Sequence, residues 1–183
     1  MKRIGLAVMG AMLLGAGRVD AQGMRYGVGA GLLLPVGDYH SLDNAGWIAG
    51  VDATYWLASG SMAIRAEGSY SRTSERPGSC CIADHKTTFA GGMVDVVYAF
   101  GRTADRIRPY VLAGVGLYNV RFSAPGVTPS SDTKVGFGGG AGVAFRVGEG
   151  STRVFLESKV TDVTSGVDLV SVPIRVGLRF GTK

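Results

Sequence analysis

The sequence predicts an all-β fold, an eight-stranded antiparallel up-and-down transmembrane β-barrel that follows a cleaved signal peptide. Eight segments alternate between apolar and polar or small residues with the period of two that marks a β-strand. The chain contains 30 glycines among 183 residues, a share that disfavours helices. Mean hydropathy is +0.21, yet beyond the N-terminal segment no run of about 18 apolar residues could cross a membrane as a helix. A closed barrel is then the remaining structure that satisfies every backbone group in lipid.

Residues 1–21 have the layout of a secretory signal peptide. Two basic residues at the start precede an apolar run over residues 4–16, and small residues occupy positions −3 and −1 before Gln22. The apolar run is too short to span a bilayer. Residues 22–183 are therefore expected to form one domain in an exported, oxidising environment.

The first four predicted strands each separate an apolar face from a face of polar residues and glycine. They cover residues 24–34, 47–57, 62–71 and 89–100. On the polar face the first strand carries Arg25, the second Asp52 and the fourth Asp95, while the third carries both Arg65 and Glu67. Since successive side chains of a strand point to opposite faces, each charge lies opposite a nearly continuous apolar row.

The last four predicted strands repeat the pattern. They cover residues 110–122, 135–147, 153–162 and 172–180. In the fifth we place Val111 outside and Tyr110 inside. The sixth alternates valine and phenylalanine with glycine, and the seventh alternates apolar with mostly charged residues. The eighth alternates five apolar residues, ending in Phe180, with a face that carries Arg175 and Arg179.

The connections differ in length at the two ends of the expected barrel. The shorter ones cover residues 58–61, 101–109 and 148–152, and the mostly longer ones cover 35–46, 72–88, 123–134 and 163–171. Short turns at one end and long loops at the other are typical of membrane barrels, as are two aromatic girdles. Near the short turns we expect Tyr55, Trp56, Tyr98, Phe100, Tyr110, Phe145 and Phe180. Near the long loops we expect Trp47, Tyr70, Phe89, Tyr118, Phe122 and Phe137.

Three stretches carry a resemblance to a known family. The last strand, with Phe180 close to its end, resembles the closing strand of bacterial outer-membrane barrels. Residues 34–39 resemble a loop common in these domains, and residues 108–110, Arg-Pro-Tyr, resemble a recurring strand opening. The mature chain thus resembles the small eight-stranded outer-membrane barrels of the OmpA/OmpX type. The resemblance implies that the chain resides in the bacterial outer membrane, with the lipid bilayer as a partner and Phe180 as part of the signal read by the barrel-assembly machinery.

The inward charges are the strongest candidate constellation. They are Asp52, Arg65, Glu67, Asp95, Arg146, Arg153, Glu157, Lys159, Arg175 and Arg179. An enzyme could use Asp52 and Glu67 as an acid and base pair. An eight-stranded barrel has an interior that side chains just fill, which favours a salt-bridged lumen instead. Inward glycines of the first and sixth strands are expected to leave room for long basic side chains.

The histidines and cysteines lie in predicted loops. His40 neighbours a serine, and some outer-membrane barrel enzymes use a histidine with a nearby serine. Adjacent side chains on an extended segment point apart, which favours a solvated loop. Cys80 and Cys81 are expected to form a vicinal or an intermolecular disulfide. Joining the nearby Asp84 and His85 as metal ligands is the lesser alternative, because their spacing fits no established zinc pattern. We predict no metal and no cofactor.

The net charge of the chain and the assignment of polar residues to the inner face of the strands exclude some classes of function. Removing residues 1–21 takes away three basic residues and one acidic residue, so the formal net charge falls from +5 to +3. A mild, unclustered positive charge does not indicate nucleic-acid binding. We predict a structural or surface-interaction role, with extracellular loops that contact a ligand and a lumen closed by ion pairs. The alternatives are a small passive pore, an exported lipocalin-like ligand binder with an apolar interior, and last an enzyme.

Overall fold

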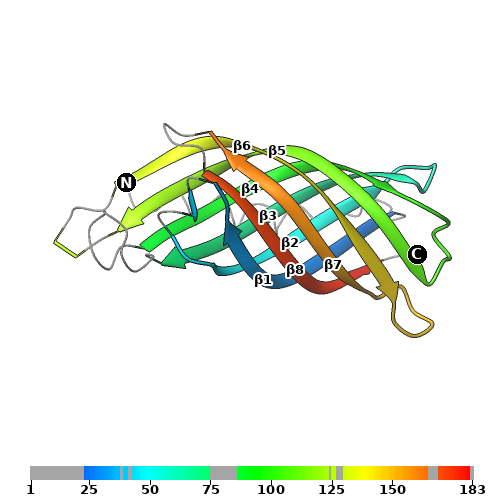
Figure 1. The fold of residues 1–183 in the computed structure, drawn as a ribbon. Helices are drawn as coiled ribbons and strands as arrows, with labels where there is room; N and C mark the ends of the chain where they lie inside the picture. Colours follow the sequence, from blue (N-terminus) through cyan, green and yellow to red (C-terminus); the bar gives the residue numbers. More distant parts are fainter. Residues whose placement is uncertain are drawn as a thin grey trace.

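The computed structural model is a closed barrel of eight antiparallel strands in which each strand pairs with its sequence neighbour and β8 pairs with β1 (Figure 1). The strands are β1 (Met24–Pro35), β2 (Gly46–Trp56), β3 (Met62–Ser74), β4 (Lys86–Ala99), β5 (Ile107–Ser123), β6 (Ser130–Arg146), β7 (Arg153–Val163) and β8 (Leu169–Gly181). This architecture confirms the predicted fold class.

The structure describes residues 23–37, 39–40, 43–74, 86–123, 125–126, 130–164 and 169–181. The predicted signal peptide, the predicted disulfide of Cys80 and Cys81, and His85 lie outside these residues. Within the described segments, no helix is long and apolar enough to cross a membrane.

Several strands extend further toward the long loops than the alternation predicts. β4 begins at Lys86 rather than at residue 89, and β6 begins at Ser130 rather than at residue 135. Backbone pairing continues here, for example between Lys86 and Ser123. The outward residues in this part are polar, so the apolar rows that mark a strand in the sequence end before the hydrogen-bonded ladder does.

The two ends of the barrel differ, although less than the sequence predicts. Tight turns lie between β2 and β3, β4 and β5, and β6 and β7, and Gly60 and Gly148 adopt positive φ angles of 68° and 66° in two of them. We call this the turn end. β1 begins and β8 finishes here, with Arg25 paired to Gly181. The opposite end is the loop end. Its connections over residues 36–45 and 75–85 are the longest, whereas those over residues 124–129 and 164–168 are as short as the turns, because β5, β6 and β8 extend further than predicted.

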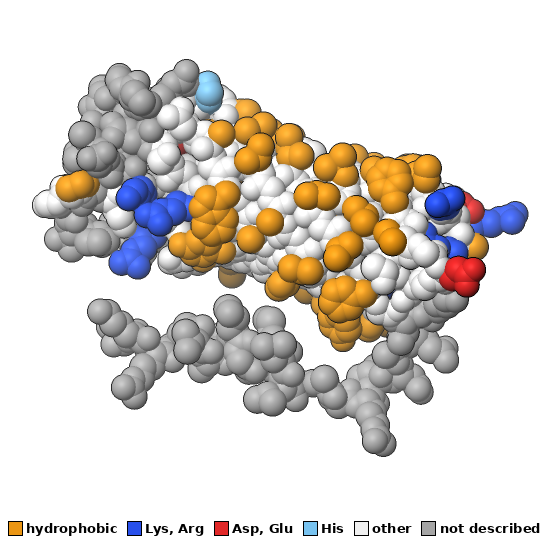
Figure 2. All heavy atoms as spheres, turned by 90° about the horizontal axis from the view of Figure 1, so that it is seen from below, with side chains coloured by type: hydrophobic (Ala, Val, Ile, Leu, Met, Phe, Trp, Pro, Cys, Tyr) orange, Lys and Arg blue, Asp and Glu red, His pale blue; other side chains and the backbone are white. Residues whose placement is uncertain are grey.

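The outward face is a band of apolar side chains. Every strand contributes to it, and Val51, Val94 and Val176 leave more than half of their surface exposed. Figure 2 shows hydrophobic side chains along the length of the barrel, with charges gathered toward its two ends. A soluble protein rarely exposes so continuous an apolar surface, whereas a lipid-facing barrel requires one.

Aromatic residues divide between the two faces. Outward rings at the turn end belong to Tyr55, Tyr98, Phe100, Phe145 and Phe180, and those at the loop end to Trp47, Tyr70 and Phe137. Of the rings expected near the interfaces, Trp56, Phe89, Tyr110 and Tyr118 are buried or partly buried in core clusters and so do not belong to the lipid-facing girdles. For Tyr110 this confirms the predicted inward orientation. Phe122 shares their inward row. Each of these lies one residue away from the outward row of its strand, so a ring near the interface can still point inward.

Replacing Val176 by arginine tests the outward face. Val176 pairs with Ala30 and Leu156 in the middle of β8. We expect Val176→Arg to lower the free energy of unfolding by about 2–4 kcal/mol, because a cation near the bilayer midplane is costly. The measurement is a urea titration of the protein folded in lipid vesicles.

Ile107→Arg is the matched control. Ile107 is equally exposed, at 56% against 55% for Val176, but it is the first residue of β5 at the turn end. Its cost should be about 0–1 kcal/mol, because charge is tolerated near the interface. Equal losses of unfolding free energy for Val176→Arg and Ile107→Arg would show that the apolar band is not in lipid.

Candidate functional site

The interior of the barrel holds a cluster of ionisable side chains, which we call the charge network. Its acids are Asp52, Glu67, Asp95 and Glu157, and its bases are Arg65, Lys159, Arg175 and Arg179. All eight are buried, although they come from β2, β3, β4, β7 and β8. Four acids and four bases cancel in formal charge.

Glu157 lies at the centre of the charge network. Its carboxylate accepts hydrogen bonds from Arg65 at 2.6 Å, from Arg175 at 2.6 Å and from Arg179 at 3.1 Å. The hydroxyl of Tyr110 donates a fourth bond, at 2.8 Å. Arg65 lies on β3 and Glu157 on β7, which are not neighbours, so this ion pair spans the lumen.

The rest of the network continues toward the loop end. Lys159 donates to Glu67 at 3.0 Å and to Asp95 at 3.2 Å. Arg175 donates to Glu67 at 2.5 Å while it also binds Glu157, so it joins the two halves. Buried charges are tolerated when they are paired and hydrogen-bonded, and here each acid has at least one base within 3.3 Å.

A glycine makes one of these pairs possible. Gly27 of β1 lies in register between Asp52 of β2 and Arg179 of β8. A Cβ at Gly27 would clash with the Asp52 carboxylate, which accepts a bond from Arg179 Nε at 3.2 Å. The glycines of β6 have a different use from the predicted one. Gly136 and Gly142 lie against the rings of Tyr118 and Tyr110, so these two make room for tyrosine instead of a basic side chain.

The geometry gives no open space for substrate between Asp52 and Glu67. The two residues are register neighbours, but Asp52 binds Arg179 and Glu67 binds Lys159 and Arg175. Cavities of about 30 and 20 Å³ lie on either side of the network. Each has room for roughly one or two water-sized particles.

A segment beyond β1 closes the loop end of the lumen. Tyr39 is buried and packs its ring edge-on against Phe89, with centroids 5.9 Å apart. Its hydroxyl lies 2.7 Å from Thr73 Oγ1, and Thr73 donates to the buried Asp43 at 2.5 Å. Burial raises the pKa of Tyr39 above its ordinary value, so the phenol stays neutral. Sequence reasoning missed this plug, although Tyr39 closes the segment 34–39 that carried a family resemblance.

Two of the predicted lumen residues do not join the charge network. Arg146 and Arg153 lie at the turn end with Arg25 and Arg108, and we call these four the arginine layer. Arg146 and Arg153 both donate to the carbonyl oxygen of Thr103, at 2.9 and 2.7 Å. Within the described residues, no member of the layer forms an ion pair. The period of two places these residues inside but does not give their height in the barrel.

The remaining candidates are peripheral. His40 is exposed beyond the end of β1, and its serine neighbour lies outside the described residues. The part of the chain that the structure describes contains no group of three residues able to hold a metal ion. Phe180 points outward at the turn end, paired with Tyr26, and its role in assembly stays a prediction.

Comparison with known proteins agrees with this architecture. Residues 4–180 match the model of the outer membrane protein beta-barrel domain family. The chain belongs to this family. It is therefore a bacterial outer-membrane β-barrel, and its apolar band faces lipid. A soluble ligand binder of lipocalin type is excluded, because such a barrel would have an apolar interior. None of the curated sequences compared with the chain matches it.

Solved structures share the fold at low sequence identity. Neisserial surface protein A superposes with a TM-score of 0.66 at 16% identity, over 87% of this chain and 97% of that one. The attachment invasion locus protein Ail of Yersinia pestis, in complex with the heparin analogue sucrose octasulfate, gives 0.56 at 18% identity, over 86% and 99%. A major outer membrane protein from Thermus thermophilus gives 0.55 at 14% identity, over 86% and 98%.

Substitution of Lys159 tests whether this outer-membrane barrel depends on charge balance. We expect Lys159→Met to destabilise the protein by about 3–5 kcal/mol, because Glu67 and Asp95 lose a buried cation. Adding Asp95→Asn should restore part of that stability, because formal charge balance returns. Free energies of unfolding in lipid vesicles measure both effects.

The control is a lysine in an exposed pair. Lys134 lies 3.6 Å from Asp132 at the loop end, with side chains 32% and 75% exposed. Lys134→Met should change stability by less than about 1 kcal/mol. If the double variant is as unstable as the sum of the two single changes, the charge-balance explanation fails.

Proposed function

We propose that this outer-membrane barrel has a closed lumen and functions through its extracellular surface rather than as a channel. The observation that carries the proposal is the continuous filling of the interior. From the turn end to the loop end, the lumen holds the arginine layer, an apolar cluster around Tyr110, the charge network and an apolar cluster that includes Tyr39.

A passive pore is the competing function, and the packing argues against it. A pore needs a water-filled path, but the described cavities of about 20 and 30 Å³ are water-sized. The side chain of Arg65 reaches across from β3 to Glu157, and Arg179 stacks 3.9 Å from the centroid of the Phe155 ring. An ion passing through would have to break several buried pairs at once.

Conductance measurements test the closed lumen. We expect the wild-type protein to give no steady single-channel current in planar bilayers. Replacing Arg175 and Arg179 by alanine should produce flickering or small currents, since the bonds that cross the lumen from β8 to Glu67 of β3 and to Tyr110 of β5 are lost. Replacing the exposed Arg72 and Arg121 by alanine removes the same charge outside the lumen. This control variant should give no single-channel current. Stable wild-type channels of appreciable conductance would favour the pore.

The surface role is supported by a basic rim at the loop end, formed by Arg72, Lys86 and Arg121. All three are exposed and lie on adjacent strands β3, β4 and β5. Thr88 of β4 pairs with Arg72 of β3 on one side and with Arg121 of β5 on the other, so the two arginines lie at the same height of the barrel with one strand between them. Figure 2 shows basic side chains gathered at this end of the apolar band.

We propose that the basic rim binds a polyanionic surface partner bearing sulfate or phosphate groups. Long loops of outer-membrane barrels lie on the extracellular side, so the rim would face the outer surface. Guanidinium groups match sulfate and phosphate geometry well. The structure of Ail was solved with a sulfated heparin analogue. That structure makes a sulfated polysaccharide a sensible first probe for this chain.

Binding to immobilised heparin tests the rim. Arg72→Gln combined with Arg121→Gln should weaken binding roughly 10- to 30-fold, at about 1 kcal/mol per basic residue near an anionic surface. Arg102→Gln with Arg106→Gln changes net charge equally at the turn end and should leave the affinity near the wild-type value. If both pairs weaken binding alike, only net charge matters, and the rim is not a site.

A further inference from the structure

A small cavity at the turn end of the lumen is surrounded by cations. Its volume is about 20 Å³, and five arginines line it: Arg25, Arg65, Arg108, Arg153 and Arg179. The other polar groups in its wall are the hydroxyls of Thr54 and Tyr110 and the indole of Trp56. Among the described residues, no carboxylate lines this cavity. Such a wall favours a negatively charged occupant.

Several hydrogen-bond donors in this wall have no acceptor. The Nε and Nη1 atoms of Arg108, Nη1 of Arg153 and Nε1 of Trp56 are buried without a hydrogen-bond partner among the described residues. Both arginine residues are only 3% exposed. Every unsatisfied atom here is a donor, and a buried donor without an acceptor is costly. An acceptor in the cavity within hydrogen-bonding reach of these donors would relieve this cost.

The two arginines are held in place by their remaining nitrogen atoms. Arg108 donates through Nη2 to the carbonyl oxygen of Gly60. Arg153 donates through Nη2 to the carbonyl oxygens of Thr103 and Asp105, at 2.7 and 3.0 Å. Arg108 also stacks on Trp56, with its guanidinium carbon 4.4 Å from the ring centroid. These contacts fix the guanidinium groups through carbonyl oxygens and a ring, and the Asp105 carboxylate is the acidic group that attracts both arginines, without forming an ion pair with either among the described residues.

Charge balance separates this region from the charge network above it. Arg65 and Arg179 are paired with Glu157 and belong to the network. Arg108 and Arg153 repel each other and have no ion pair among the described residues. Arg25 and Arg146 add like charge near Arg153, and only Asp105 among the acidic groups acts on both arginines, so positive charge is in excess here. A water molecule would satisfy donors without reducing this repulsion, whereas an anion would do both.

We propose that the cavity beside Arg108 and Arg153 is a binding site for a small inorganic anion of halide size, such as chloride. The volume of about 20 Å³ accommodates roughly one water-sized particle. The bound anion completes the donor set at the turn end and closes the lumen there electrostatically.

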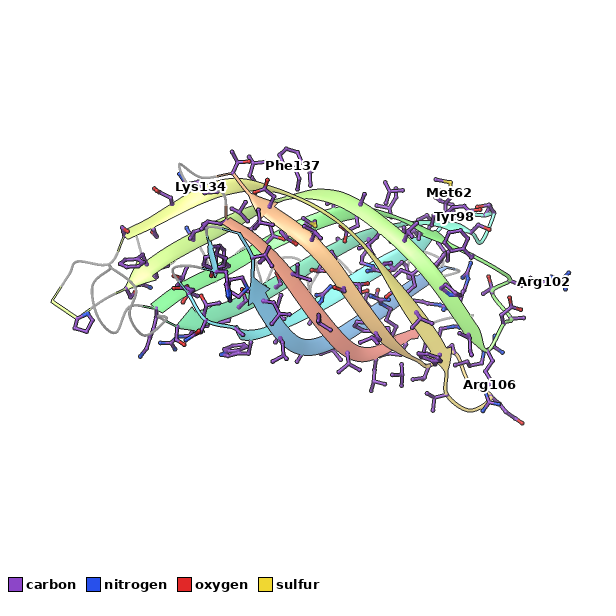
Figure 3. The ribbon with its side chains drawn as sticks, viewed as in Figure 1. Met62, Tyr98, Arg102, Arg106, Lys134 and Phe137 are labelled. Atoms are coloured by element: carbon purple, nitrogen blue, oxygen red, sulfur yellow. The ribbon has the colours of Figure 1, made fainter. Side chains whose placement is uncertain are left out.

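Chloride-35 NMR of the folded protein in nonionic detergent tests the site. The wild type should broaden the chloride resonance in a saturable way, and bromide should reverse the broadening at constant ionic strength while sulfate should not. Arg108→Gln combined with Arg153→Gln should reduce the specific broadening at least tenfold. Arg102→Gln with Arg106→Gln is the control, because both side chains point away from the barrel at the same end (Figure 3). This control should keep the wild-type broadening.

A second measurement uses the wild type alone, so that it does not depend on whether the variants fold. The unfolding temperature should rise with chloride relative to gluconate at equal ionic strength, because a ligand that binds only the folded state stabilises it. Absence of saturable broadening together with identical unfolding temperatures in both salts would overturn the proposal. Equal loss of broadening in the arginine-layer variant and the control would overturn it as well.

Discussion

Closure of the sheet is the constraint on which the rest of this structure depends. No water is present in the bilayer core, so every backbone N–H and C=O group must pair within the protein. The pairing of β8 with β1, from Arg25–Gly181 to Pro35–Ser171, removes the last open edges. Closure also divides every strand into an outward and an inward row. Apolar residues occupy the outer row because lipid covers it, and the inner row is left for polar residues.

The interior follows from the size of the barrel. Eight strands enclose a space that side chains can just fill, so charges placed there lose their water and must find partners. The charge network meets this requirement with matched acids and bases. Its central pair, Arg65 with Glu157, joins β3 and β7 across the lumen and thereby ties together strands that share no backbone hydrogen bond. The same packing that stabilises the barrel removes a conducting path.

The two ends of the lumen are closed by different chemistry. At the loop end, Tyr39 enters from beyond β1 and joins an apolar cluster with Phe89, Met93, Tyr118 and Val163. At the turn end, guanidinium groups gather around a cavity with unsatisfied donors. The apolar plug is complete with the protein's own atoms, whereas the four arginines of the arginine layer have only Asp105 as an acidic group that acts on Arg108 and Arg153. This contrast makes the turn end the place where a bound ion would contribute most.

The sequence by itself determined the number of strands, the two faces of most of them and the end of the barrel that carries the two longest loops. These are local properties, because a period of two can be read in any ten residues. Only the tertiary structure decided which base meets which acid, since Arg65 and Glu157 are 92 positions apart and their contact depends on how the strands are staggered. Arg146 and Arg153 flank the turn between β6 and β7, and this position at the turn end separates them from the charge network. Placement of Tyr39 also needed the folded chain, because a loop residue has no periodic pattern to show that it points into the barrel.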